Sequence, residues 1–251
     1  MIGVFDSGVG GLAVLREVRA LLPDADLLYL ADQAHAPYGE RPLEAVRERA
    51  ERVAGYLVSA GASTVVVACN TASAVALQQL RSLHPDVPIV GMVPAVKPAA
   101  AGTTNGIVGV LATPATFRTT VVADLVERFA AGVRVIDRPC PGLAGLVEDG
   151  GADLAAVAAH VAPLVEAGAD TIVIGCTHYS FVTDLIGDAA GPAVSVIDPA
   201  PAVARQVARV ALAPSGRGTT RFVTTGDPER FAAQIHRLLG IDAASVGRAV
   251  T

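Results

Sequence analysis

Two stretches of the sequence are near copies of one another, and they constrain the fold more than any other feature. Residues 65–74 read VVVACNTASA and residues 172–181 read IVIGCTHYSF. Each is a run of mostly β-branched apolar residues that ends in a small residue, a cysteine and two polar residues. Such a run is typical of a strand buried on both faces, as in a parallel sheet. Helix-compatible residues follow, so Cys69 and Cys176 are each expected where a strand passes into a helix.

A second pair of landmarks repeats at almost the same interval. The predicted strands IGVF (2–5) and IVGVLA (107–112) place Gly3 and Gly109 106 residues apart, while Cys69 and Cys176 are 107 apart. This constant offset indicates an internal duplication of one α/β unit. We therefore expect an α/β fold with two similar domains built on mostly parallel sheets.

The domain boundaries follow from a stretch at 94–105 that is rich in Pro, Ala, Gly and Thr. It is expected to be the crossing between a first domain, 1–94 plus 205–251, and a second domain, 95–204. Besides the two cysteine strands, the pattern predicts strands at 2–5, 27–31, 88–92, 107–112, 133–137, 194–198 and 219–225. Helices are predicted at 12–22, 43–60, 72–83, 115–130, 152–167, 179–186, 201–212 and 229–239, with a loop at 138–145. The last strand and helix are expected to return to the first domain.

Composition and charge exclude several classes of protein. A hydrophobic content of 52% supplies a large core, and a net charge of −5 with scattered arginines gives no basic face for nucleic acid. Three cysteines without a C-x-x-C pair fit a reducing compartment. The longest near-apolar window, 154–165, contains His160 and Pro163 and is too short to cross a bilayer. With no basic, apolar leader at the start, a cytoplasmic protein without a membrane segment is expected.

The two motif cysteines are the candidate reactive groups. In open α/β sheets ligands bind at the carboxyl ends of the strands, and a helix N-terminus favours the thiolate form of a cysteine. Two thiols at equivalent edges of two similar halves would present one acid/base to each face of a small ligand. That arrangement suits inversion of a stereocentre. Cys140, between two prolines, lacks such a motif and is expected to be structural.

Three further ionisable residues are candidates for proton transfer near the thiols. Asp6 ends the first strand, Glu148 precedes a glycine pair, and His178 follows Cys176 by two residues. Each also has a simpler explanation as a helix cap or a solvated side chain. Neutral donors suited to holding carboxylates occur in the same motifs: Ser7, Asn70, Thr71, Thr113, Thr116 and Thr177.

Two alternatives involve a metal or a cofactor lysine. Cys176-x-His178 together with Cys69 could supply three zinc ligands, although zinc sites usually show paired ligands at short spacing in each segment. Pyridoxal phosphate needs a lysine, and the chain has one, Lys97, between two prolines. Neither alternative accounts for the matched thiols.

A third alternative is a dinucleotide site. The turn Gly8-x-Gly10-x-x-Ala13 follows a strand, and Asp32 stands at the next strand end, where a ribose-binding acid belongs. Against this reading, Asp6 would bring a carboxylate close to the pyrophosphate, and both thiols would be unexplained.

Six motifs in order, FDSGVGGLAVL, APYGERP, VACNTASA, VGVLATPAT, CPGLAGLVE and GCTHY, resemble those of the glutamate racemases in the aspartate/glutamate racemase superfamily. The resemblance spans almost the whole chain. It implies two flavodoxin-like domains with the active site in the cleft between them. It also implies cofactor-independent two-base racemisation of L- and D-glutamate, supplying D-glutamate for peptidoglycan and so for cell wall and cell shape. Members of the family often dimerise, which leaves a homodimer open for this chain, although its oligomeric state is not readable from the sequence. No nucleic-acid or membrane partner is expected.

The resemblance also implies a role for each motif residue. Cys69 and Cys176 would be the two bases, Asp6 would assist the first, and His178 with Glu148 the second. Substrate contacts would come from Asp6, Ser7, Tyr38, Gly39, Asn70, Thr71, Thr113, Thr116, Thr177 and His178. The chain departs from the family pattern at Ser180, where proline is usual, and in the loop 31–39, which contains Gln33 and His35.

Two rival functions stay open at this point. A racemase for aspartate or another amino acid would use the same fold, because the length of the substrate side chain is not readable from the sequence. A dinucleotide-binding oxidoreductase would be a different class. A non-enzymatic role, such as the gyrase binding reported for some family members, is a third possibility.

Overall fold

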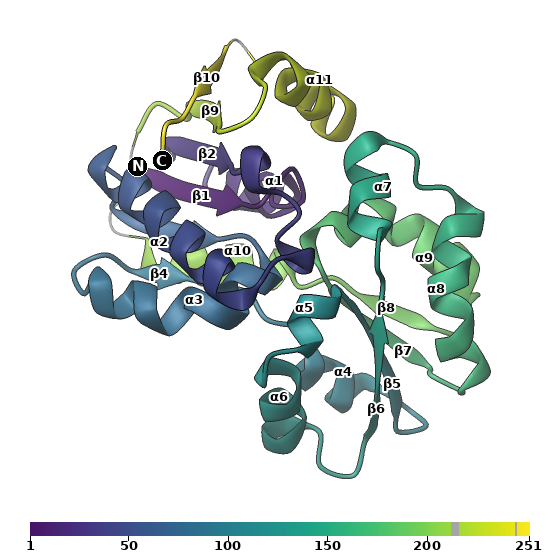
Figure 1. Cartoon of the computed structure of the whole chain (residues 1–251). Helices are drawn as coiled ribbons and strands as arrows, with labels where there is room; N and C mark the ends of the chain where they lie inside the picture. The colour runs from purple at the N-terminus through teal and green to yellow at the C-terminus, as the bar shows by residue number, and fades with distance from the viewer. Residues whose placement is uncertain (212–215, 244) are drawn as a thin grey trace. The chain divides into compact units, whose positions relative to one another are not determined.

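The computed structural model describes residues 1–211, 216–243 and 245–251 (Figure 1). The chain divides into two compact units, one formed by Met1–Met92 with Ala200–Thr251 and the other by Val93–Pro199. The domain boundaries predicted after residues 94 and 204 stay a prediction.

The first unit is built on a six-stranded sheet in the order β10-β9-β2-β1-β3-β4. Its strands are β1 (Ile2–Asp6), β2 (Leu27–Ala31), β3 (Thr64–Val67), β4 (Ile89–Val90), β9 (Thr220–Thr224) and β10 (Val246–Arg248). Every pairing in it is parallel. All residues of β1, β2 and β3 are buried, as their continuous apolar runs predict for central parallel strands.

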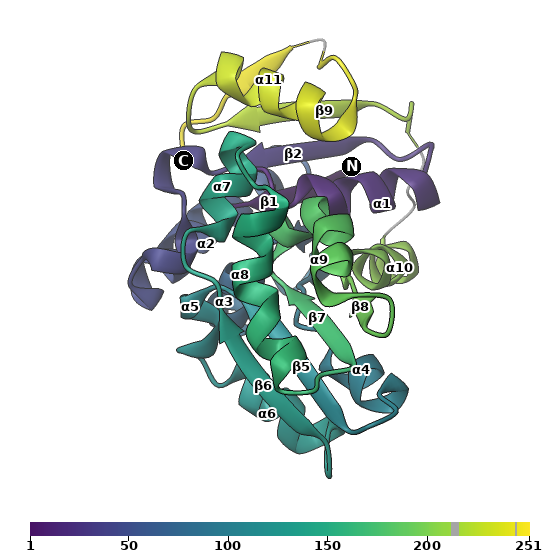
Figure 2. The ribbon, with the colours of Figure 1, turned by 90° about the vertical axis from the view of Figure 1, so that its right-hand side faces the viewer.

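Helices cover both faces of this sheet. They are α1 (Leu12–Leu21), α2 (Leu43–Ser59), α3 (Asn70–Leu83), α10 (Ala200–Val210) and α11 (Pro228–Leu239), with the short 3₁₀ helices η1 (Gln33–His35) and η2 (Tyr38–Glu40). Helices α2 and α3 pack together on one face, and α1 and α10 pack together on the other (Figure 2). Chain segments from both ends of the sequence therefore build one core.

The second unit is built on a four-stranded parallel sheet in the order β6-β5-β7-β8. Its strands are β5 (Ile107–Ala112), β6 (Arg134–Pro139), β7 (Thr171–Gly175) and β8 (Ser195–Ile197). The helices are α4 (Val96–Gly102), α5 (Pro114–Phe117), α6 (Val121–Phe129), α7 (Leu143–Asp149), α8 (Leu154–Glu166), η3 (Thr177–Val182) and α9 (Thr183–Ala190). Helices α7, α8 and α9 lie on one face of this sheet, and α4 and α6 on the other (Figure 1).

The two sheets share one strand order. In the first unit the second, first, third and fourth strands lie side by side, and in the second unit β6, β5, β7 and β8 repeat that order. This is the doubly wound order of flavodoxin-like sheets. The expected α/β class, the parallel sheets and the duplication are confirmed. The return of the segment 219–225 to the first unit is confirmed too, because β9 pairs with β2.

Several predicted elements were wrong in detail. The crossing expected at 94–105 contains helix α4, and the loop expected at 138–145 runs into helix α7, which carries Glu148. The single helix predicted at 115–130 is two helices, α5 and α6, since residues 118–120 turn between them. Strand β4 has two residues rather than five, and β10 was not predicted because its three residues carry no apolar period. The end of the helix predicted at 201–212 falls on residue 212, which lies outside the described residues.

No helix in the described ranges is both long and apolar enough to cross a membrane. The hydrophobic cores of the two units consist of short aliphatic strands and the apolar faces of the helices that cover them.

Gly109 of β5 shows how closely the second unit is packed. A Cβ atom added there would lie 2.5 Å from Leu164 Cδ1 and 3.0 Å from Leu164 Cγ, and Leu164 is fully buried on α8. We expect Gly109→Ala to lower the free energy of unfolding by about 1–3 kcal/mol, because the extra methyl overpacks a filled core. Thermal and urea unfolding measure the loss.

Gly187 supplies the matched control in the same unit. It lies within helix α9, and a Cβ atom there would meet nothing within 4 Å. Gly187→Ala should be neutral or stabilising by up to about 1 kcal/mol, because alanine favours a helix over glycine. A Gly109→Ala variant as stable as Gly187→Ala would contradict this account of the packing.

Candidate active site

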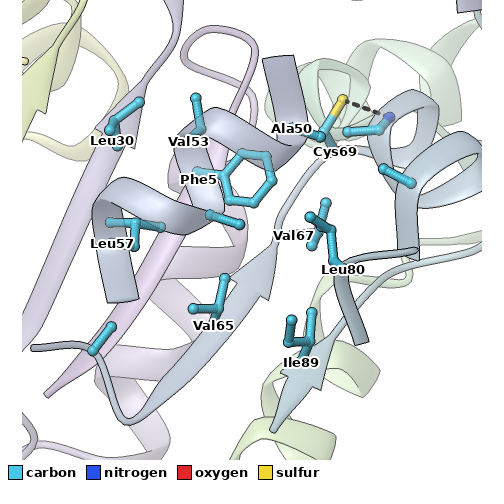
Figure 3. Packing of buried hydrophobic residues seen from close by; sticks show 14 of the residues in the cluster. Phe5, Leu30, Ala50, Val53, Leu57, Val65, Val67, Cys69, Leu80 and Ile89 are labelled. Carbon is cyan, nitrogen blue, oxygen red and sulfur yellow. Dashed lines mark hydrogen bonds between the residues drawn. The ribbon is translucent and has the colours of Figure 1, made fainter. Parts of the chain in front are cut away.

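Cys69 follows β3 after one residue, Ala68, and caps helix α3. Its backbone is extended, with φ −141° and ψ 121°, and its Sγ accepts a hydrogen bond from the amide of Ala72 at 3.5 Å (Figure 3). The residue is 5% exposed. A sulfur atom at this position faces the partial positive charge of a helix N-terminus, which stabilises negative charge there.

Cys176 occupies the equivalent position in the second unit. It follows β7, its backbone has φ −144° and ψ 132°, and it is 6% exposed. His178 Nδ1 lies 3.8 Å from Cys176 Sγ, and His178 Nε2 lies 2.9 Å from Glu148 Oε2. The three side chains thus form a thiol–imidazole–carboxylate row, in which the carboxylate fixes the orientation of the imidazole.

Asp6, at the end of β1, is fully buried and is part of the glycine turn. Its Oδ2 accepts a hydrogen bond from the amide of Gly11 at 2.8 Å, and its Oδ1 lies 3.4 Å from Ser7 Oγ. A Cβ atom at Gly11 would lie 2.8 Å from Asp6 Cβ and 2.9 Å from Ala68 Cβ, so the ends of β1 and β3 are close together. Asp6 therefore supports the turn and also stands at the sheet edge that carries Cys69.

Asn70 is the most informative polar residue of the first motif. It is 3% exposed, and among the described residues neither Nδ2 nor Oδ1 of its amide has a hydrogen-bond partner. A buried amide without partners costs roughly 1–3 kcal/mol. Such a group at a sheet edge, beside a candidate base, fits a bound ligand with both donors and acceptors.

The remaining predicted contacts lie at the same two edges. Thr113 Oγ1 and Thr116 Oγ1 are 3.1 Å apart after β5, and Thr177 is buried beside Cys176. Ser7, Tyr38, Gly39 and Thr71 are buried in the first unit. Ser7, Asn70, Thr71, Thr113, Thr116 and Thr177 thus lie after the first or third strand of their sheets, the switch point where ligands bind in such sheets, while Tyr38 and Gly39 lie in η2, after the second strand β2.

Two residues that contact the surroundings of the motif residues were not among the predicted site residues. Asp32, considered only as a ribose ligand, accepts a hydrogen bond from the Tyr38 hydroxyl at 2.5 Å. Tyr179 donates to the Cys140 carbonyl at 3.2 Å and lies in the same buried cluster as Cys176. A polar residue directly after a buried strand was the available signal for Asp32.

Within the described residues no group of three His, Cys, Asp or Glu could hold a metal ion. Lys97 lies on α4, and its Nζ is 5.2 Å from the centroid of the Phe129 ring on α6. Burial raises the pKa of the Cys140 thiol to about 12, so this thiol is protonated at neutral pH.

The sequence and the fold are both similar to those of known racemases. Residues 12–207 match the family model described as Asp/Glu/Hydantoin racemase. The glutamate racemase of Roseiflexus sp. (strain RS-1) is 51% identical, covering 94% of this chain and 91% of that protein. The glutamate racemase of Pseudomonas aeruginosa PAO1 is 49% identical, covering 99% and 97%. The Escherichia coli glutamate racemase structure, in complex with L-glutamate and the activator UDP-MurNAc-Ala, is 32% identical, with TM-score 0.89 and coverage of 99% and 97%.

The chain therefore belongs to the Asp/Glu/hydantoin racemase family, a family of isomerases. Within it, the nearly full-length relatives place this enzyme with the glutamate racemases.

Proposed function

We propose that this racemase interconverts L- and D-glutamate without a cofactor, with Cys69 and Cys176 as two bases that act on opposite faces of the substrate Cα. The observation that carries the proposal is the matched placement of the two thiols. Each follows the third strand of its sheet, with nearly the same backbone angles, in two sheets of the same strand order.

The reaction balances with these groups alone. One cysteine, as thiolate, removes the Cα proton and becomes a thiol, and the electron pair left on Cα is delocalised into the substrate carboxylate. The other cysteine, as thiol, gives a proton to the opposite face and becomes a thiolate. The two thiols have then exchanged protonation states, and the reverse reaction starts from the product state.

The other motif residues assist this chemistry. Asp6 supports proton transfer at Cys69, while His178, oriented by Glu148, supports it at Cys176. The substrate would be held by Asp6, Ser7, Tyr38, Gly39, Asn70, Thr71, Thr113, Thr116, Thr177 and His178. For Tyr38 the contact would not use the hydroxyl, which is engaged with Asp32. The unpartnered amide of Asn70 suits a ligand that carries both carboxylate and ammonium groups.

The substrate assignment rests on the relatives. The Escherichia coli glutamate racemase structure holds L-glutamate. We infer from the family resemblance that the D-glutamate formed by this enzyme supplies peptidoglycan synthesis. A homodimer stays a prediction from the family resemblance.

The test is incubation of the enzyme with D-glutamate in D₂O without added cofactor. We expect the circular dichroism signal to decay to zero while deuterium enters at Cα. D-aspartate in a parallel reaction separates the two substrates. Inversion of aspartate without inversion of glutamate, or inversion without deuterium, would refute the proposed reaction.

A further inference from the structure

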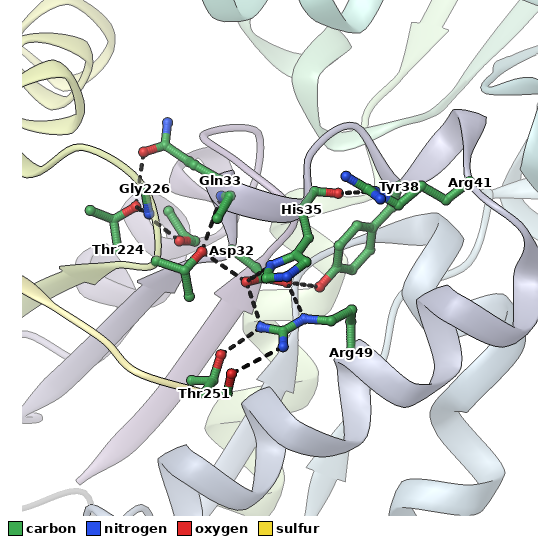
Figure 4. A network of polar contacts seen from close by, with 12 residues as sticks. Asp32, Gln33, His35, Tyr38, Arg41, Arg49, Thr224, Gly226 and Thr251 are labelled. Atoms are coloured by element: carbon green, nitrogen blue, oxygen red, sulfur yellow. Dashed lines mark hydrogen bonds and ion pairs between the residues drawn. The ribbon is translucent and has the colours of Figure 1, made fainter.

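Asp32 directly follows β2 and is the centre of a dense polar network in the first unit. Its side chain is fully buried. Figure 4 shows its carboxylate surrounded by side chains from other segments of the chain. Arg49 Nη2 and Nε donate to its two oxygens at 2.8 and 3.0 Å, the Tyr38 hydroxyl donates at 2.5 Å, and Thr225 Oγ1 donates at 2.9 Å. His35 Nδ1 lies 3.0 Å from Oδ1.

This set of partners fills the carboxylate, which has about four lone-pair sites. No capacity is left for a ribose hydroxyl, so the dinucleotide role considered for Asp32 does not fit. Burial raises the pKa of Asp32. The hydrogen bonds from Arg49 and Tyr38 lower it by more than burial raises it, so the pKa of Asp32 lies below its ordinary value. Asp32 is a permanently charged acceptor at neutral pH.

The partners of Asp32 tie a loop to the body of the unit. Tyr38 and His35 belong to the segment 33–41, which contains η1 and η2. Arg49 lies on α2, and Thr225 follows β9. The loop also closes on itself, because Arg41 Nε donates to the carbonyl of His35. The buried carboxylate of Asp32 therefore holds the part of the loop that carries His35 and Tyr38. The start of the loop has contacts of its own, because Gln33 Nε2 donates to Gln234 Oε1 at 2.7 Å and the amide of Ala34 donates to Thr225 Oγ1 at 3.1 Å.

Arg49 is itself held on its far side. Its Nη1 donates to the main-chain oxygen of Thr251 at 3.1 Å, and its Nη2 donates to Thr251 Oγ1 at 2.5 Å. The residue is 8% exposed. A buried ion pair is often no more stabilising than apolar residues of similar volume. We therefore explain the Asp32–Arg49 ion pair by its effect on the geometry of the loop rather than by stability alone.

The side chain that the network fixes lies beside a candidate base. The Tyr38 ring is buried in the same hydrophobic cluster as Cys69 and Ala72. Burial and the charge of Asp32 raise the pKa of Tyr38 far above its ordinary value, so its hydroxyl stays a donor to Asp32. Asp32 thereby sets where the ring and the neighbouring Gly39 stand.

We propose that Asp32, together with Arg49, is a positioning residue of the racemase: through Tyr38 it holds segment 33–41 in the conformation that receives the substrate beside Cys69. This proposal rests on the proposed function of Cys69 and of the Tyr38–Gly39 segment. Asp32 takes no part in proton transfer.

The test compares kinetic parameters for glutamate in Asp32→Asn and Tyr38→Phe. The first variant replaces one acceptor oxygen with a donor, and the second removes only the hydroxyl. If only about a tenth of the variant molecules hold the loop in the conformation that binds substrate, the apparent dissociation constant for glutamate rises about tenfold. Saturating substrate shifts all molecules into that conformation, so kcat is largely preserved. We expect KM to rise about tenfold and kcat to change less than threefold.

Asp26→Asn is the matched control, because Asp26 flanks the other end of β2. Its carboxylate accepts hydrogen bonds from Arg217 N at 3.1 Å and from Thr219 N and Oγ1 at 3.0 and 2.6 Å. Loss of a structural carboxylate reduces the amount of folded enzyme, which lowers the apparent kcat but not KM. Asp26→Asn should leave KM within twofold of the wild-type value.

Amide hydrogen exchange without substrate supplies a readout that is independent of catalysis. The amides of His35, Ala36, Glu40 and Arg41 donate hydrogen bonds within the loop. They should exchange faster in Asp32→Asn and Tyr38→Phe and remain unchanged in Asp26→Asn. Unchanged exchange in both loop variants, or faster exchange with an unchanged KM, overturns the positioning role. Failure of the wild-type enzyme to racemise glutamate would instead overturn the proposed function.

Discussion

Cys69→Ser and Cys176→Ser are each expected to lower kcat/KM for glutamate inversion by at least about 10³-fold in both directions. A serine hydroxyl is far less acidic than a thiol, so the variant loses one of two acid/base groups, and such a group contributes roughly 10²–10⁴-fold. Both directions fail together because each turnover needs a base on one face and an acid on the other. Polarimetry or circular dichroism measures the rate.

Each single variant should still exchange one enantiomer. With one thiol left, the enzyme can remove the Cα proton that faces it and return a deuteron from the same side. Cys69→Ser and Cys176→Ser should therefore deuterate opposite enantiomers of glutamate in D₂O without inverting them. Deuteration of the same enantiomer by both variants would contradict the two-base assignment, as would either variant with more than a tenth of wild-type inversion.

Cys140→Ser is the matched control. The Cys140 thiol is 2% exposed and donates to the carbonyl of Arg138 at 3.3 Å, a bond that a serine hydroxyl can also form. Its raised pKa keeps it out of acid/base chemistry at neutral pH. Racemisation by this variant should stay within about threefold of the wild-type rate.

His178→Asn is expected to lower kcat/KM by about 10²-fold, the second largest effect. The imidazole joins Cys176 Sγ, at 3.8 Å, to the Glu148 carboxylate, at 2.9 Å. Asparagine has a donor near the position of Nδ1 but cannot take up a proton, so the thiol loses its proton partner. Steady-state kinetics in both directions measure the loss.

Glu148→Gln and a double variant separate orientation from proton transfer. Glutamine can still accept a hydrogen bond from the imidazole, so Glu148→Gln should cost only about tenfold. Groups that act as a unit are not additive, so His178→Asn should add little in the background of Cys176→Ser. Full additivity of those two substitutions would show that His178 acts independently of Cys176.

The fold was predictable to the extent that its signals are local. The apolar runs that became β1, β3, β5 and β7 are read directly from neighbouring residues. Helices α4 and α7 were missed because each contains a residue that disfavours a helix in isolation, Pro98 in α4 and Gly145 in α7. Tertiary packing of Val96 and Ala99, and of Leu143 and Val147, stabilises them nevertheless.

The candidate site was readable from the sequence only where its pattern is local. A cysteine followed by two polar residues after a buried strand is a local pattern, and it led to Cys69, Cys176 and the residues beside them. The partners that give these residues their environment come from distant parts of the chain. Glu148 reaches His178 across 30 positions, and Asp32 meets Arg49 across 17 and Thr225 across 193.

The sequence by itself determined the α/β class, the duplication and the position of both cysteines at strand ends, because apolar period and strand-ending residues act over a few neighbouring positions. Only the tertiary structure decided the strand order, the imidazole–carboxylate contact at Cys176 and the filling of the Asp32 carboxylate. These depend on which strands pair and which helices cover them. These pairings depend on the burial of whole sheet and helix faces, so they cannot be read from the residue at any single position.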